Sequence, residues 1–130
     1  MNLQLSDYAS EPGALTLEEM QEIHQEMLTG LEKDEDGREL YQELVAVAVK
    51  YAAVRQEWLL LSLAKQAERD ASRTAIHDSL IIKFNMLERY QKMNGKGGTW
   101  RERLGDEKEN RKRIGDMGCY IAFVQGLCGR

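Results

Sequence analysis

The chain has 130 residues, of which 42% are hydrophobic and 31% are charged, with a single proline and a net charge of −4. A chain of this size is expected to form one domain whose core needs neither disulfides nor a metal. The apolar fraction excludes an intrinsically disordered protein. One proline disfavours an all-β sandwich, which needs many turns, and favours long helices.

The charge is distributed unevenly along the chain. Residues 1–50 carry a net charge of −9, residues 51–88 are neutral, and residues 89–130 carry +5. Two explanations are open: the two charged ends are interaction surfaces, or they pack beside each other as oppositely charged helices of one bundle. We favour the second explanation, because attraction between neighbouring helices is common and mildly stabilising.

The N-terminal segment has neither a basic start nor an apolar run of signal-peptide length, and no apolar stretch approaches the roughly 20 residues that span a bilayer. We therefore predict a cytoplasmic protein without a membrane segment. Cys119 and Cys128 would lie on opposite faces of one helix, so reduced thiols are expected. Residues 1–15 are expected to form a flexible arm, and residues 16–130 a single helical-bundle domain.

Apolar residues recur every three or four positions along most of this domain, which predicts helices. The first helix follows a capping box formed by Thr16 and Glu19, and it ends near Gly30. The short acidic loop 32–37 separates it from a strongly apolar second helix that begins near Asp36. A helix that is apolar on nearly all sides is expected to lie at the centre of the fold.

Nothing in residues 38–94 forces a helix to end, although one helix of that length would be about 85 Å long. We therefore expect a break at Asp70–Ser72, where either end residue can cap a new helix. The alternative is one continuous helix covered by a second subunit. The segment is expected to end at Asn94–Gly95, with the glycine in a left-handed conformation.

The last third of the chain contains a glycine-rich loop and two further helix starts. The loop is residues 95–98, and a second capping box at Thr99–Glu102 opens a short helix that ends at Gly105. Asp106 and Glu109 begin the last helix in the same way. The predicted fold is therefore all-α, an antiparallel helical bundle of four main helices and one short helix.

Small residues follow one face of the last helix at spacings of three and four. A glycine inside a helix costs about 1 kcal/mol relative to alanine, so the pattern needs a reason, and the close approach of another backbone supplies one. We expect the neighbour to be the second helix of the same chain; the alternative is the last helix of another subunit. The predicted helix-packing face consists of Gly115, Gly118, Ala122 and Gly126.

Asp116 lies within the apolar part of this helix, and a buried carboxylate needs a partner. The candidate partners are Arg73, His77 and Arg89 on the preceding helix. A cluster of Arg73, His77 and Asp116 in a cleft is capable of acid–base chemistry. We favour a structural ion pair that sets the helix register, because no nucleophile or metal ligand accompanies the lone histidine.

Basic residues gather between positions 92 and 113, with Tyr90 and Trp100 among them, in a pattern typical of nucleic-acid or anion binding. The glycine loop before Thr99 also offers backbone amides to an anion. The acidic balance of the whole chain and the absence of a helix-turn-helix pattern argue against nucleic acid. The candidate anion-binding residues are Lys96, Arg101, Arg103, Arg111 and Arg113.

The sequence contains no metal, cofactor or catalytic motif: His24 and His77 have no second ligand at metal-binding spacing, and the glycine loop lacks P-loop spacing. The leading hypothesis is a non-enzymatic module that binds a protein partner, most simply as a homodimer. One alternative is anion or nucleic-acid binding through residues 92–113. A second alternative is a small-ligand binder or enzyme that uses Arg73, His77 and Asp116.

Overall fold

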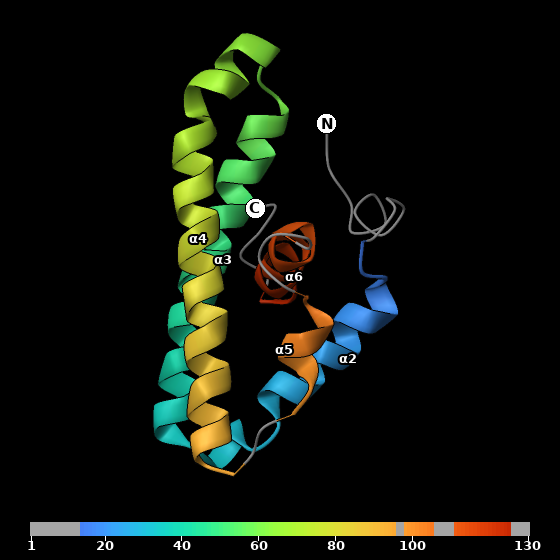
Figure 1. The fold of residues 1–130 in the computed structure, drawn as a ribbon, viewed down its shortest axis with the longest axis vertical. Helices are drawn as coiled ribbons and strands as arrows, with labels where there is room; N and C mark the ends of the chain where they lie inside the picture. Colours follow the sequence, from blue (N-terminus) through green and yellow to red (C-terminus); the bar gives the residue numbers. More distant parts are fainter. Residues whose placement is uncertain (1–13, 96–97, 106–110, 126–130) are drawn as a thin grey trace.

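The computed structural model describes residues 14–95, 98–105 and 111–125. Within these ranges four longer helices and one short α-helix pack together, with no strand, so the predicted all-α helical bundle is confirmed (Figure 1). The elements are α2 (Leu17–Leu28), the 3₁₀ helix η1 (Leu31–Lys33), α3 (Glu35–Leu59), α4 (Leu63–Met93), α5 (Trp100–Arg103) and α6 (Arg111–Val124).

The two longest helices, α3 and α4, run antiparallel and form a hairpin along the long axis of the molecule (Figure 1). The turn between them lies at residues 60–62, where the Ser62 hydroxyl accepts a hydrogen bond from the Lys65 amide. The predicted break at Asp70–Ser72 is therefore wrong, because α4 runs through that segment without interruption. Residues 38–94 belong to two helices rather than one.

Two reciprocal hydrogen bonds join the helices beside this turn. The Trp58 indole donates to the Gln66 carbonyl at 3.1 Å, and the Gln66 side-chain amide donates to the Trp58 carbonyl at 3.1 Å. Both bonds form only when the chain reverses between these two residues. The turn therefore depends on a contact between side chains and backbone that helical periodicity does not reveal.

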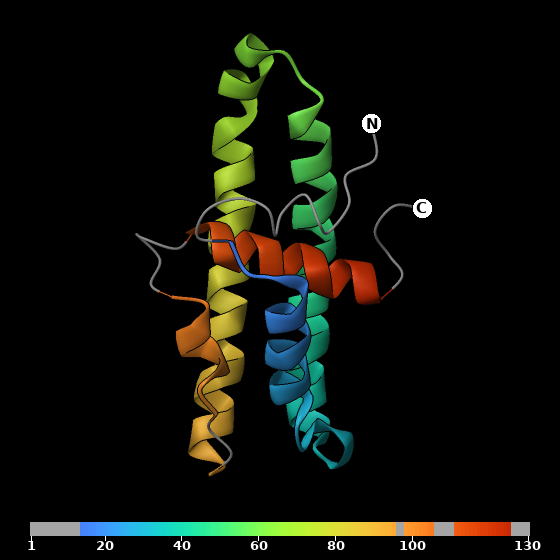
Figure 2. The same ribbon diagram turned by 90° about the vertical axis from the view of Figure 1, so that its right-hand side faces the viewer.

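Helix α6 lies across both helices of the hairpin (Figure 2), and its central residues are buried on all sides. Glycine permits the close approach. A Cβ atom at Gly115 would lie 2.6 Å from the Tyr51 hydroxyl, and one at Gly118 would lie 2.5 Å from a Leu80 methyl. The small face of α6 thus packs on α3 and on α4 of the same chain, and Gly126 lies outside the described residues.

Helices α2 and α5 cover the half of the hairpin that lies far from the turn (Figure 2). The predicted capping box of α2 is present, with Thr16 and Glu19 exchanging two hydrogen bonds of 3.0 Å. Residues 1–13 of the predicted arm lie outside the described residues, while Leu15 is buried. The largest fully buried side chains are Trp100, Phe84, Leu15, Met20, Ile23, Met27, Leu44, Leu80, Leu87, Leu104, Ile114 and Met117.

A chain of buried polar groups links three helices inside this core. The Trp100 indole donates to the Gln91 side-chain oxygen at 2.8 Å, and the Gln91 amide donates to the Met27 carbonyl at 2.8 Å. Because each buried polar group finds a partner, the core avoids the penalty of an unsatisfied donor or acceptor. These bonds fix how α5, α4 and α2 sit against one another.

The segment around the glycine loop departs from its prediction. Gly95 has the expected left-handed φ of 72°. Thr99 precedes α5, but its side chain makes no capping hydrogen bond, so the second capping box is wrong. The Glu26 carboxylate instead accepts from the Thr99 amide at 2.7 Å, which occupies the amide expected to bind an external anion. The predicted helix start at Asp106 and Glu109 lies outside the described residues.

Asp34 in the acidic loop has a structural role at the start of α3. Its Oδ1 atom accepts from the Gly37 amide at 3.0 Å and from the Tyr90 hydroxyl at 2.5 Å. The hydrogen bond from Tyr90 to this carboxylate raises the pKa of the phenol to about 12. The bond ties the beginning of α3 to the end of α4.

Candidate functional site

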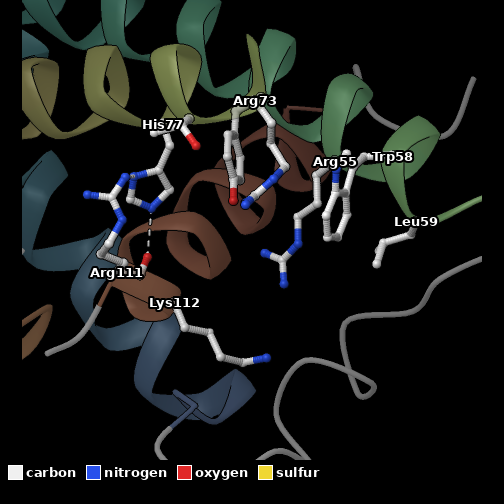
Figure 3. Close-up of a pocket in the computed structure, with 9 residues that line it drawn as sticks. Arg55, Trp58, Leu59, Arg73, His77, Arg111 and Lys112 are labelled. Carbon is white, nitrogen blue, oxygen red and sulfur yellow. Dashed lines mark hydrogen bonds between the residues drawn. The ribbon is translucent and has the colours of Figure 1, made fainter. Parts of the chain in front are cut away.

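A cleft of about 510 Å³ opens beside α6 where that helix crosses the hairpin. Its described walls come from the second half of α3, the first half of α4 and the first turn of α6 (Figure 3). On α3, the spacing of Tyr51, Arg55 and Trp58 places the three side chains on one helix face. The lining residues are Tyr51, Arg55, Trp58, Leu59, Arg73, Thr74, His77, Arg111 and Lys112.

His77 is bonded to Arg111 through both nitrogens of its ring. Nε2 lies 2.8 Å from the Arg111 carbonyl oxygen (Figure 3), and Nδ1 lies 3.1 Å from the Arg111 Nη2 atom. Because a guanidinium can only donate, Nδ1 accepts, and we assign the ring proton to Nε2, which donates to the carbonyl. Burial lowers the pKa of His77 and outweighs the hydrogen bond to the Arg111 backbone, which raises it, while the charge of Arg111 adds to the lowering. The neutral ring therefore positions Arg111 at the cleft.

Arg73 and Trp58 form an ordered wall on the side nearest the hairpin turn. The guanidinium carbon of Arg73 lies 4.6 Å from the centroid of the Trp58 ring, which is a cation–π contact. The indole is held in turn by its hydrogen bond to Gln66. Arg73 also pairs with Asp70 at 2.8 Å. The tryptophan thus supplies a flat apolar surface beside a fixed positive charge.

The ion-pair partner of Asp116 is Arg55, which corrects the prediction that Arg73, His77 or Arg89 takes this role. Arg55 Nη1 lies 3.0 Å from Asp116 Oδ1, and the carboxylate side chain is 0% exposed. The pair joins α6 to α3 and holds the Arg55 guanidinium at the cleft. Of the predicted cluster, Arg73 and His77 line the cleft, whereas Asp116 is not one of the described lining residues.

The described lining carries four cationic side chains and no carboxylate. The neighbouring carboxylates differ in burial: the side chain of Asp116 is fully buried, whereas those of Asp70 and Asp78 are 53% and 55% exposed. An exposed ion pair contributes at most about 1 kcal/mol. A ligand anion can therefore replace Asp70 beside Arg73 and Asp78 beside Arg111, while Asp116 keeps Arg55 in place.

The other predicted anion-binding residues lie elsewhere. Arg101 donates to a side chain of α4, Arg103 pairs with a glutamate of α2 at 2.9 Å, and Arg113 donates to the Arg103 carbonyl at 3.2 Å. These bonds hold α5 against its neighbours. Lys96 lies outside the described residues. Arg111 is the described member of this set that lines the cleft.

Several cleft residues carry no clear site signal in the sequence. Tyr51 and Trp58 fit the apolar face predicted for the second helix, and Arg55 lies between them on that face. An arginine flanked by two aromatic residues on one apolar helix face was the available signal. Its carboxylate partner is 61 residues away, so the sequence did not indicate what balances the charge.

Comparison with known protein families, with curated proteins and with solved structures gives no match to this chain. Among the helices of the described ranges, none combines the length and the apolar character that a membrane crossing needs. In the same part of the chain, no three His, Cys, Asp or Glu side chains gather as a metal site would require. The function is therefore inferred from the geometry of the cleft.

Proposed function

We propose that the chain binds a small organic anion in the cleft between α3, α4 and α6. The observation that carries the proposal is the convergence of four cationic side chains on one cleft whose walls also contain Trp58, Tyr51 and Leu59. Guanidinium groups are suited to phosphate, sulfonate and carboxylate groups. The volume of about 510 Å³ lies within the range of roughly 300–1,000 Å³ that is usual for small-molecule sites.

The cationic groups are held in place before a ligand arrives. Arg55 is anchored by the buried Asp116, Arg111 by the ring of His77, and Arg73 by the face of Trp58. Because these side chains are already ordered, binding loses less side-chain entropy than it would with free arginines. The three arginines come from three helices, so a bound anion would also stabilise the crossing of α6 over the hairpin.

The chemical class of the ligand follows from the two kinds of side chain that line the cleft, which are cationic and aromatic. The arginines suit the anionic group, and the part of the Trp58 indole that Arg73 does not cover suits a flat apolar group joined to it. We propose binding rather than catalysis, because His77 has both ring nitrogens engaged by Arg111 and is not available as a general base in this arrangement.

The test is a calorimetric titration with phenyl phosphate, compared with inorganic phosphate and with phenol. Phenyl phosphate is expected to bind more tightly than either fragment, and more weakly as salt screens the arginines. The variant Arg73→Gln is expected to lose about tenfold or more in affinity. Arg69→Gln is the matched control, since Arg69 lies one turn earlier on α4 with a side chain that is 56% exposed.

Two results would contradict the proposal. One is the absence of binding by both phenyl phosphate and inorganic phosphate at low salt. The other is an equal loss of affinity in Arg73→Gln and Arg69→Gln, which would indicate attraction to the overall charge of α4 rather than to the cleft.

A further inference from the structure

The outward face of α4 presents a ridge of exposed side chains, all small or apolar except one arginine. The large members are Ile82, Met86 and Met93, which are 56%, 41% and 80% exposed. Ala75, Ser79 and Arg89 are also exposed and continue the line at spacings of three and four. Figure 1 shows α2, α5 and α6 on one side of the hairpin. The exposed fractions show that the ridge is left uncovered. We define the α4 ridge as Ala75, Ser79, Ile82, Met86, Arg89 and Met93.

We propose that the α4 ridge packs against the α4 ridge of a second copy of this chain, with the two helices antiparallel. The first argument is shape. When the pairing is centred on position 84, Ala75 faces Met93 of the second copy and Ile82 faces Met86. The remaining layer places Ser79 opposite Arg89. Each layer joins a smaller residue to a longer one, which lets the two ridges interlock as in an antiparallel coiled coil.

The second argument is charge. Asp78 lies beside Ser79, and its carboxylate pairs with Arg111 of the same chain at 2.9 Å while its side chain stays 55% exposed. In this pairing the exposed part of the carboxylate also lies near Arg89 of the second copy. Arg89 forms no ion pair within the described residues, so this contact gives it a partner. A parallel pairing would instead place Arg89 against Arg89 and Asp78 beside Asp78. Like charges in contact are unfavourable, so the charges select the antiparallel arrangement.

The first test is the oligomeric state, measured by sedimentation at increasing protein concentration. The natural chain is expected to form a dimer, and Ile82→Glu is expected to remain a monomer, because the new carboxylates would be buried beside Met86. Leu63→Glu is the matched control, since Leu63 is on the same helix, is 84% exposed and lies off the ridge. A natural chain that stays monomeric, or a dimer that Ile82→Glu leaves unchanged, would overturn the proposal.

The second test is disulfide trapping in a Cys119→Ser, Cys128→Ser background. The double variant Ala75→Cys, Met93→Cys is expected to form a covalent dimer on oxidation, whereas each single variant is not. In the antiparallel pairing the two copies of Ala75 lie about 27 Å apart, at 1.5 Å per residue along the helix. A covalent dimer of either single variant would indicate a parallel pairing and overturn the proposal, as would the absence of a link in the double variant.

The ridge residues do not line the anion cleft. A failure of this inference therefore leaves the proposed anion binding standing, and the reverse also holds.

Discussion

The two halves of the α3–α4 hairpin have opposite characters. The half far from the turn is covered by α2 and α5 (Figure 2). It contains fully buried side chains such as Leu44, Phe84 and Leu87. The half near the turn leaves Leu60 and Leu63 exposed at 62% and 84%. Helix α6 marks the boundary between the two halves. The contrast indicates that the first half supplies most of the stability of the fold.

The half near the turn is held by polar contacts instead of apolar packing. The Arg55–Asp116 pair, the two Trp58–Gln66 hydrogen bonds and the Arg73–Trp58 contact all lie there. Replacing a buried ion pair by well-packed apolar residues is often neutral or stabilising, so stability alone does not explain this choice. Polar groups of this kind around a cleft are what a binding site requires, and the comparison of the two halves therefore supports the proposed function.

The largest expected loss of stability comes from truncating a core side chain in the half far from the turn. Phe84→Ala removes a fully buried ring that packs near Trp100, so we expect a loss of about 3–5 kcal/mol in the free energy of unfolding. Leu63→Ala, at the exposed turn, is expected to change it by no more than about 0.5 kcal/mol. Urea unfolding measures both. Equal losses would remove the distinction between the halves.

A smaller but substantial effect is expected from the buried ion pair. Arg55→Ala leaves the carboxylate of Asp116 buried without its guanidinium, which is expected to cost about 3 kcal/mol. The exposed Arg69–Glu57 pair provides the comparison, and Arg69→Ala is expected to cost less than about 1 kcal/mol. Chemical denaturation of the two variants measures the difference. If they unfold alike, the Arg55–Asp116 pair does not anchor α6.

The glycine face of α6 is expected to show a graded response to alanine. Replacing Gly115 or Gly118 by alanine raises the helix propensity, which favours the folded state by about 1 kcal/mol. At Gly115 the added methyl meets the hydroxyl of Tyr51, a rigid ring packed against His77, so overpacking is expected to give a net loss of about 1–2 kcal/mol. At Gly118 it meets a Leu80 methyl, which can rotate, so the loss is expected to be smaller. The reverse order in thermal unfolding would contradict this packing.

The smallest effect concerns acid stability. Burial lowers the pKa of His77, so below about pH 6.5 the unfolded chain binds a proton more readily than the folded chain. Stability is therefore lost as the pH falls from that value through the folded pKa. His24 contributes in the same direction because burial also lowers its pKa. Each histidine adds at most about 1.4 kcal/mol per pH unit to the slope with which the free energy of unfolding falls.

The variant His77→Gln tests this acid effect, because glutamine keeps a donor for the Arg111 carbonyl but does not titrate. The decline in unfolding free energy between neutral and mildly acidic pH is expected to be shallower in His77→Gln than in the natural chain. An unchanged decline would show that His77 is not held in its neutral form by the fold.

Local signals in the sequence predicted the local features of the fold. The capping box at Thr16 and the left-handed Gly95 depend on residues within one helical turn, and both are present. The hairpin turn was misplaced because it depends on Trp58 and Gln66 meeting across the reversal. The capping box at Thr99 failed for a related reason, since a carboxylate 73 residues away competes for the same amide.

The candidate site was predictable only in part. The sequence predicts Arg73 and His77 as partners of Asp116 on a stripe bordering an apolar helix face, and Arg111 as part of the basic region 92–113. All three line the cleft, although Asp116 pairs with Arg55. The sequence places the three residues in two separate hypotheses, because helical periodicity does not show which faces of α4 and α6 meet. Arg55 was missed because its role depends on Asp116 of the crossing helix.

The most direct test of the anion cleft is the response of the two tryptophan indole N–H signals in an NMR titration with phenyl phosphate. Trp58 lines the cleft, whereas the Trp100 indole is buried and donates to Gln91, so the second signal is an internal control. If the cleft binds the anion, the Trp58 signal shifts and saturates while the Trp100 signal stays fixed. A Trp58 signal that does not move, or that moves no more than the Trp100 signal, would contradict it.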